Sequence, residues 1–534
     1  MPGADVVIRG GLVYDGSGGP PSSADVLVAG DRILAIGNGG AGANEIDARG
    51  LAVAPGFVNI LSWANESLLA DGRALSDVSQ GVTLEVLGEG DSMGPLTPAM
   101  KEELVSQQTI VHYDVEWTTL GEYLERLTQR GIAPNVASFV GAATVRAHVV
   151  GYEDRRPEPR ELEQMKALVR AAMAEGAVGV SAALIYPPGC YAHTPELIEL
   201  ARAAGERGGL FAAHIRSEGD HLLEALEELI TIAREAAVPA ELYHLKAAGR
   251  GNWRKLDAAI AAIEEAQNAG IAIASDMYTY AAASTGLSAG LPPWVQEGGF
   301  HAFRERLRES AIRDRLEGEM SEPNSEWENL FLLAGPENIR FTQFRTDELR
   351  PNTGRTLAEV AAERGLSPAQ TVMQLIVEDG SRIEAAYTLM SEENVRRQVA
   401  LPWMSFCSDS IALAPEGVFL QVRPHPRAYG SFARLLARYV REQNLVPLEE
   451  AIRRLSALPA ERLGLGGRGR LEPGYFADIV VFDPAAIEDH ATFDDPHQLA
   501  TGIVHVLVNG LPVVRDGEPL DARPGRFLRG PGSQ

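Results

Sequence analysis

The chain has 534 residues, of which 45% are hydrophobic and 23% charged, so it is long enough to bury a large core and to carry accessory parts. Its formal net charge of -25 argues against nucleic acid and anionic membranes as partners. The N-terminus lacks a basic flank before an apolar stretch, and no apolar run approaches the roughly 18 residues of a membrane-spanning helix. The two cysteines, Cys190 and Cys407, are too few for a disulfide framework. We therefore expect a cytoplasmic protein.

Both ends of the chain have the pattern of short strands broken by Gly-rich turns. Residues 4 to about 52 show it first, and FADIVVFDP from Phe476 and GIVHVLVNGLPVVRDG from Gly502 show it again. Asn509 and Gly510 predict a hairpin turn in the last of these stretches. We expect segments 1–53 and 466–534 to pair into one small β-sandwich outside the main domain.

Between these ends, apolar runs alternate with helical patterns. Eight such runs are present, at 51–61, 82–88, 136–141, 177–184, 210–215, 241–245, 271–278 and 403–409. Eight strands that alternate with helices predict an α/β fold, a (β/α)8 TIM barrel. The seventh and eighth runs are too far apart for a normal connection. We therefore assign the barrel to 54–280 and 401–465 and an insertion with a small subdomain to 281–400, where HAFRERLRESAIRDRLEGEM is helical in pattern.

The stretch from Gly209 to Gly251 carries the clearest chemical signal. One apolar run delivers His214 at its end, a helical pattern follows, and a second run delivers His244, with Lys246 two residues later. Side chains at the carboxyl ends of neighbouring barrel strands meet at the active-site face, so the two imidazoles are placed to share a metal ion. The alternative is that each is a buried structural histidine.

With these motifs the chain resembles the D-aminoacylase (N-acyl-D-amino-acid deacylase) family of the amidohydrolase superfamily. The resemblance rests on a set of segments that runs along nearly the whole chain in the family's order. They include APGFVN (54–59), QGVTLEVLGEG (80–90), ALIYPPGCYAHTPEL (183–197), HIRSEGD (214–220), HLKAAGRGNW (244–253), SDMYTYAAASTGL (275–287), CSDS (407–410) and HPRAYGSF (425–432). The fold it implies is the same barrel with a small β-sandwich built from both termini.

The resemblance assigns the catalytic carboxylate to Asp409, in the CSDS motif. In the superfamily this Asp takes a proton from the metal-activated water and passes it to the leaving amine. Its alternative role is to cap the turn or helix that follows. The family commonly has a Cys metal ligand after the second strand, where this chain has none. Glu89, with Gly on both sides, is the expected replacement, Asp91 is the second choice, and a solvated turn carboxylate is the alternative.

The first strand departs most from the family pattern. Amidohydrolases usually follow this strand with His-X-His, which binds a second metal, but the matching residues here are Asn59, Leu61, Ser62 and Trp63. Leu and Trp do not ligate metals. We therefore expect one zinc ion per chain, held by Glu89, His214 and His244, and regard this chain as a divergent member.

For the substrate carboxylate, the resemblance points to Lys246, Arg427 and either Tyr278 or Tyr280, because guanidinium, ammonium and phenol groups are suitable donors. Arg427 could instead form a structural ion pair. We also consider Tyr186, Ser284 and Thr285 as pocket residues and Trp63 as an apolar wall for an acyl or aromatic group. His148, His193 and His425 are weaker candidates.

These expectations describe a metal-dependent amidohydrolase that cleaves the linear amide C–N bond of an N-acyl-D-amino acid or a small D-residue-containing peptide. The alternatives are a cyclic amide or ester hydrolase and a catalytically silent homologue that binds a ligand. The expected partner is a small molecule with a carboxylate, and association into a homo-oligomer is left open.

Overall fold

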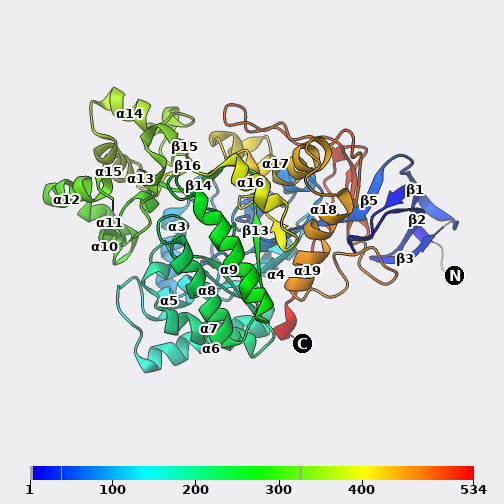
Figure 1. Ribbon diagram of the computed structural model, residues 1–534, viewed down its shortest axis with the longest axis horizontal. Helices are drawn as coiled ribbons and strands as arrows, with labels where there is room; N and C mark the ends of the chain where they lie inside the picture. The colour runs from blue at the N-terminus through cyan, green and yellow to red at the C-terminus, as the bar shows by residue number, and fades with distance from the viewer. Residues whose placement is uncertain (1–3, 38, 324–326, 534) are drawn as a thin grey trace.

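The architecture comes from a computed structural model that describes residues 4–37, 39–323 and 327–533 (Figure 1). The extreme ends of the predicted terminal segments, and three residues of the predicted insertion, lie outside the described residues. Among those described, the strands form a nine-stranded sheet, a six-stranded sheet and two three-stranded sheets.

All of the predicted middle strands are present, and they are parallel. The three-stranded parallel sheet has the order β6-β7-β8 and the six-stranded one β17-β13-β12-β11-β10-β9. Their bounds are β6 (Phe57–Asn59), β7 (Val82–Leu87), β8 (Asn135–Ser138), β9 (Val140–Gly141), β10 (Gly179–Ala183), β11 (Leu210–His214), β12 (Ala240–Leu242), β13 (Ile273–Met277) and β17 (Met404–Phe406).

Helices connect most of these strands, as parallel pairing requires, and further helices follow the last of them, β17. They are α1 (Ser67–Ala70), α2 (Leu75–Val78), α3 (Pro98–Gln107), α4 (Leu120–Arg130), α5 (Ala142–Val149), α6 (Pro159–Glu175), α7 (Thr194–Gly205), α8 (Leu222–Ala236), α9 (Leu256–Asn268), α16 (Glu392–Val399), α17 (Arg427–Arg434), α18 (Leu448–Leu455) and α19 (Ala457–Arg462). The helical pattern predicted between His214 and His244 is α8, which begins at Leu222.

The two parallel sheets meet at both edges. Strands β8 and β9 are separated by Phe139 alone. At the other edge the backbone N–H of Asp409, after β17, donates to the carbonyl of Leu61, after β6, at 3.0 Å. These links bring the strand ends that carry the candidate residues to one region of the molecule.

Side chains alternate between two buried layers along the parallel strands. In β11, Phe211 and Ala213 belong to the apolar cluster shared with α7 and α8, whereas Leu210 and Ala212 belong to a second cluster with Leu84 of β7. Because both faces of these strands are buried, their sequences are continuous apolar runs and do not alternate between apolar and polar residues.

Strands from both chain ends combine in the nine-stranded sheet, as the turn-rich pattern predicts. The sequence run at 51–61 divides here, because its first half pairs with β18 in this sheet and its second half begins the parallel sheet. The predicted hairpin turn is present, and Asn509 and Gly510 both have positive φ, 49° and 81°. The strands are β1 (Ala4–Val13), β2 (Ser22–Ala29), β3 (Arg32–Gly37), β4 (Gly42–Asp47), β5 (Ala52–Pro55), β18 (Ile479–Phe482), β19 (Ile503–Val508), β20 (Leu511–Arg515) and β21 (Glu518–Pro519).

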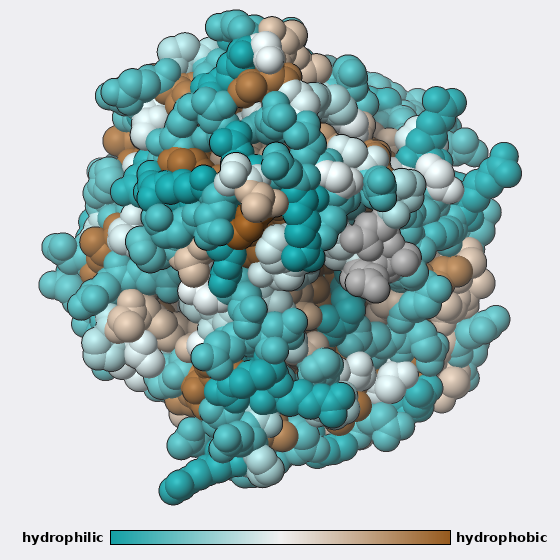
Figure 2. Space-filling view, turned by 90° about the vertical axis from the view of Figure 1, so that its left-hand side faces the viewer, coloured by the Kyte–Doolittle hydropathy of each residue, from teal (hydrophilic) through white to brown (hydrophobic). Residues whose placement is uncertain are grey.

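The predicted insertion forms its own antiparallel sheet with flanking helices, at the end of the molecule opposite β1–β3 (Figure 1). The predicted helical stretch divides into α11 and α12. The elements are β14 (Ala282–Gly286), β15 (Ile339–Gln343), β16 (Glu384–Thr388), α10 (Pro293–Gln296), α11 (Gly299–Arg306), α12 (Ser310–Ser321), α13 (Leu330–Ala334), α14 (Leu357–Arg364) and α15 (Pro368–Asp379). Figure 2 shows that the face at this end is mainly hydrophilic, with hydrophobic residues scattered over it.

Within the described residues, none of the helices has both the length and the apolar character needed to cross a membrane.

A buried polar network ties the large sheet to β8. Arg468 forms an ion pair with Asp478 and donates from Nη2 to the Asn509 side chain at 2.9 Å. Asn509 in turn donates from Nδ2 to Asn135 of β8 at 2.8 Å. The charged side chains of the pair are 5% and 8% exposed, so neither charge can rely on water if its partner is lost.

We therefore expect Arg468→Ala to lower the free energy of unfolding by about 3–5 kcal/mol, because it leaves a buried carboxylate uncompensated. Urea denaturation measures this change. Arg49→Ala, which removes a pair whose side chains are 79% and 58% exposed, is the matched control and should change it by less than about 0.5 kcal/mol. Equal losses in the two variants would contradict the role of the network.

Candidate metal centre and substrate cavity

Glu89 reaches the centre through a turn that requires glycine. Gly88 and Gly90 both have positive φ, 93° and 67°. A Cβ on Gly88 would lie 2.5 Å from the Phe139 carbonyl oxygen, and one on Gly90 would lie 2.4 Å from the Ala183 Cβ. Larger residues would therefore push the turn away from the neighbouring strands and withdraw the Glu89 carboxylate.

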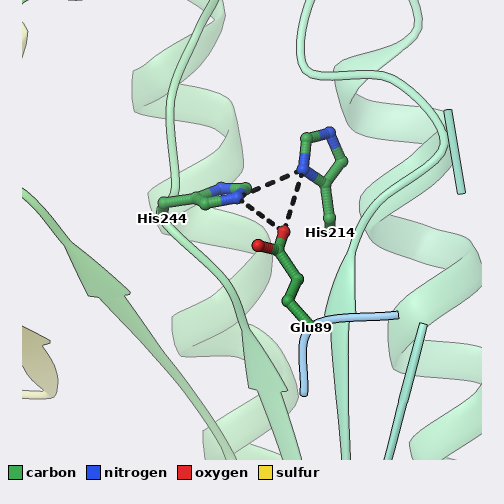
Figure 3. Close-up of side chains that lie close together, drawn as sticks. All are labelled: Glu89, His214 and His244. Carbon is green, nitrogen blue, oxygen red and sulfur yellow. Dashed lines mark hydrogen bonds and ion pairs between the residues drawn. The ribbon is translucent and has the colours of Figure 1, made fainter. Parts of the chain in front are cut away.

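Three side chains from three strand ends converge at this point (Figure 3). The Glu89 Oε1 atom lies 3.3 Å from His214 Nδ1 and 3.0 Å from His244 Nε2, and the two nitrogens are 3.1 Å apart. All three side chains are buried, and their ligand atoms lie within 4.8 Å of one another. Asp91, the second-choice ligand, lines the adjoining cavity but is not a member of this group.

The spacing of these atoms fits a metal ion. Ligands held about 2.0–2.2 Å from a tetrahedral zinc lie roughly 3.3–3.5 Å from one another. One carboxylate oxygen and two imidazole nitrogens are a common donor set for zinc at a catalytic site, where a further position stays open for water or substrate. The His214 imidazole directs its Nδ1 atom into the cluster. Its Nε2 atom is buried without a hydrogen-bond partner among the described residues.

Glu218 orients His244 from behind the cluster. Its Oε1 atom lies 3.0 Å from His244 Nδ1 and accepts a hydrogen bond from Lys246 Nζ at 2.6 Å. Lys246 Nζ also lies 2.8 Å from His244 Nδ1, so Glu218 holds the ammonium and the imidazole together and places negative charge behind this candidate ligand. The backbone N–H of His244 donates to Asp276 at 2.9 Å, which helps to hold this residue at φ 35°.

The electrostatics of the cluster favour a cation. Burial would raise the pKa of Glu89, but the adjacent imidazoles outweigh burial and hold this pKa below its usual range. Burial and Lys246 lower the pKa of His244, but the surrounding carboxylates outweigh them and raise it to about 10. These carboxylates are those of Glu89, Glu218 and Asp409. The site thus attracts positive charge to the point where the imidazoles meet.

Asp409 lies across the cluster in a strained backbone conformation, with φ 48°. Its Oδ2 atom is 2.7 Å from Arg427 Nη1, and its Oδ1 atom accepts a hydrogen bond from the Trp63 indole at 3.2 Å. Burial raises the pKa of Asp409, in opposition to the attraction of Arg427. Asp409 does not cap a helix here, because it precedes an irregular segment.

A cavity of about 530 Å³ opens beside these groups, which is large enough for a small acylated amino acid. The insertion contributes to its wall through β14 and β16. The predicted substrate residues in its lining are Trp63, Tyr186, Lys246, Tyr278, Ser284, Thr285 and Arg427.

The remaining candidates are placed differently. The structure locates Tyr280 outside the described cavity lining, and its hydroxyl donates to Asp489 at 3.3 Å, so of the two tyrosines Tyr278 is the one beside the site. His425 lines the cavity, where its Nδ1 accepts from the Arg427 backbone at 2.9 Å. Neither His148 nor the exposed His193 is in this lining.

The first strand supplies no imidazole to the centre, as its sequence predicts. Asn59 donates from Nδ2 to Glu85 at 2.8 Å, and Leu61 is buried in the apolar interior. Glu218 and Asp276 are not among the site residues predicted from the sequence. Glu218 lies four residues after His214, and this spacing could have indicated that it is near the site. No local pattern indicates that Asp276 contacts His244.

A parallel α/β scaffold that gathers a carboxylate, two imidazoles and an opposing Asp at its strand ends is the framework of a metal-dependent hydrolase. The family model described as "Amidohydrolase family" matches residues 44–514, and the chain belongs to the amidohydrolase family. The predicted resemblance to its D-aminoacylase and N-acyl-D-amino-acid deacylase members is confirmed by the relatives that follow.

The chain is 36% identical to D-aminoacylase of Alcaligenes xylosoxydans xylosoxydans over 98% of its own length and 97% of that protein. A second relative is the crystal structure of N-acyl-D-glutamate deacylase from Bordetella bronchiseptica in complex with zinc and a phosphonate mimic of the tetrahedral intermediate. The identity is 32% and the TM-score 0.81, and the match covers 99% of this chain and 100% of that chain. A structure of D-aminoacylase described as having a binuclear metal centre, with one-metal activation and second-metal attenuation, has 34% identity and a TM-score of 0.82 and covers 98% and 100% of the chains.

We expect Glu218→Gln to weaken zinc binding by about 10- to 100-fold, because the loss of carboxylate charge behind His244 lowers the basicity of the ligand. Competition with a chromophoric chelator measures the affinity. Glu224→Gln, on an exposed side chain of α8, is the control and should leave the affinity unchanged. Equal affinities for the wild type and Glu218→Gln would show that this carboxylate does not tune the centre.

Proposed function

We propose that this protein is a zinc-dependent deacylase that hydrolyses the linear amide bond of an N-acyl-D-amino acid or a small D-residue-containing peptide. The observation that carries the proposal is the convergence of Glu89, His214 and His244 at 3.0–3.3 Å beside a substrate-sized cavity. The names of the relatives support the substrate class.

We assign one zinc ion to each chain, with Glu89, His214 and His244 as its protein ligands. When bound, zinc supplies Lewis-acid activation of water and of the substrate carbonyl. The contribution of the chain is to hold the three donors: the glycine turn brings in the carboxylate, and Glu218 lies behind His244 and fixes its position.

Asp409 acts as general base and then as general acid. It takes a proton from the attacking water and returns it to the nitrogen that departs as the C–N bond breaks. Burial keeps its pKa above that of a solvated Asp, which suits a group that must both accept and release a proton. Contacts on both carboxylate oxygens fix its direction.

Arg427 and Tyr278 bind the substrate carboxylate, assisted by Lys246. The Arg427 Nη1 atom is close to Asp409, but the contact lacks hydrogen-bond geometry, so Nε and Nη1 have no hydrogen-bond acceptor among the described residues. The buried hydroxyl of Tyr278 likewise has none in the described part of the chain. Unsatisfied buried donors are costly, and a carboxylate would satisfy them. Lys246 already donates to Glu218 and adds positive charge.

Other residues shape the cavity around the acyl group and the amino-acid side chain. The Trp63 ring and Tyr186 form apolar walls, and Ser284 and Thr285 come from the insertion strand β14. The Thr285 hydroxyl donates to the Tyr186 hydroxyl at 2.9 Å, which ties the insertion to the wall of the cavity.

For the scaffold, we propose that the parallel strands close into one (β/α)8 barrel and that the nine-stranded sheet folds over as a small β-sandwich. The links between β8 and β9 and between Asp409 and Leu61 support closure. A separate apolar cluster within the terminal sheet supports the sandwich. The corresponding division is 1–53 and 466–534 for the sandwich, 54–280 and 401–465 for the barrel, and 281–400 for the insertion.

Removal of metal should abolish hydrolysis, and added zinc should restore it. We expect elemental analysis to find close to one zinc per chain, none in a His214→Ala/His244→Ala variant and the wild-type amount in His193→Ala, which alters an exposed residue. N-acyl-D-amino acids should be cleaved in preference to their L-enantiomers, as measured by release of the free amine. Full activity in a metal-free protein would contradict the mechanism.

Asp409→Asn should lower kcat by about 10²- to 10⁴-fold, because an amide cannot carry the proton between water and the leaving nitrogen. Steady-state kinetics with a cleaved N-acyl-D-amino acid measures this loss. Zinc content should stay at the wild-type value, since Asp409 is not among the proposed ligands. Asp494→Asn, at a side chain 89% exposed, serves as control. A decrease of less than threefold in Asp409→Asn would remove this residue from the chemistry.

A further inference from the structure

Trp63 stands where the family pattern has a metal-binding histidine, and its indole is fixed in place. Its backbone N–H donates to the Ser410 carbonyl at 2.9 Å, which joins the segment after β6 to the segment after β17. The indole Nε1–H lies 2.9 Å from Glu89 Oε2 and 3.2 Å from Asp409 Oδ1. A single donor therefore bridges the proposed metal ligand and the proposed general base.

Each of the four carboxylate oxygens of Glu89 and Asp409 has a partner, and two of the oxygens share the Trp63 indole. Glu89 directs Oε1 to the two imidazoles and Oε2 to Trp63. Asp409 directs Oδ2 to Arg427 and Oδ1 to Trp63. The inner oxygens of two buried carboxylates thus converge on one point, and repulsion between them must be offset there by a cation or a hydrogen-bond donor.

The indole N–H is that donor, and it leaves no room for a cation. A metal placed between Glu89 Oε2 and Asp409 Oδ1 would meet the Nε1 hydrogen, and an indole nitrogen has no lone pair to offer it. The neighbouring side chains do not provide other ligands, because Leu61 is apolar and Asn59 is engaged with Glu85 and Ser408.

We propose that Trp63 is a positioning residue that takes the place of a second metal ion. Its N–H orients the Asp409 carboxylate toward the attacking water, holds the Oε2 atom of Glu89, and closes the second metal position. The inference rests on the proposed zinc site and goes beyond it, since it assigns an electrostatic task to a side chain expected to serve as an apolar wall. The D-aminoacylase structure described with a binuclear centre and second-metal attenuation provides the contrast.

The test compares zinc binding and kinetics in the wild type and three variants. Trp63→Phe keeps an aromatic ring but removes the N–H, and Trp63→His puts a ligand in its place. Trp294→Phe is the matched control, because the Trp294 indole donates to the Glu319 carboxylate at 2.8 Å, and Trp294 is not part of the described cavity lining. Apo protein is titrated with ZnCl2 by calorimetry, bound zinc is measured after dialysis, and thermal melting checks that each variant is folded.

We expect one zinc in the wild type, Trp63→Phe and Trp294→Phe, and a second, weaker zinc in Trp63→His. In Trp63→Phe, kcat should fall by about 10- to 100-fold, because the carboxylate loses its orienting partner, while KM changes little. Excess zinc should attenuate Trp63→His but not the wild type. The zinc-induced change in tryptophan emission should persist in Trp294→Phe and disappear in Trp63→Phe.

Failure of the proposed function and failure of the role of Trp63 give different results. A wild-type protein that binds no zinc overturns the proposed metal site and this inference with it. One zinc in the wild type, combined with an unchanged kcat in Trp63→Phe, leaves the proposed function standing and overturns the role of Trp63. Two zinc ions in the wild type overturn both the role of Trp63 and the assignment of one zinc per chain, but not the proposed deacylase activity. If Trp63→His does not fold, the response of wild-type activity to excess zinc and the kinetics of Trp63→Phe still decide the question.

Discussion

The contact of one Glu89 oxygen with two imidazoles is the interaction on which the site depends. It joins segments 125 and 155 positions apart in the chain, and it exists because parallel strands bring their carboxyl ends to the same region. The surrounding structure serves this contact: glycines let the carboxylate approach, Glu218 orients His244, and Asp276 holds the strained backbone of that histidine.

Opposite charges alternate across the centre, so that each of its buried charged groups faces a group of opposite charge. Lys246 faces Glu218, the imidazoles face Glu89, and Arg427 faces Asp409. Trp63 spans the gap between the two carboxylates that no charged side chain fills. In a setting with little water, such pairing determines both where a cation can bind and which donors remain for a substrate.

The parts outside the parallel sheets have distinct tasks. The insertion supplies β14 and β16 to the cavity wall, although it forms a separate antiparallel sheet. The terminal sheet lies at the opposite end and is joined to β8 through the buried Asp478 and Asn509 network. The ends of the chain thus stabilise the scaffold, while the insertion shapes what enters it.

The sequence by itself determined the parallel strands, the hairpin at Asn509 and Gly510, and the positions of His214, His244 and Asp409 near strand ends. These features are local, because apolar runs and turn residues report burial and strand termination directly. The missing His-X-His was also visible in the sequence. Only the tertiary structure placed Glu89, and not Asp91, beside the two imidazoles and Tyr278, and not Tyr280, in the described cavity lining. Only it brought the Trp63 indole to two carboxylates, one of them 346 positions away. The physical reason is that such contacts depend on strand register and turn geometry, and a change of a few ångströms in either would replace one partner with another.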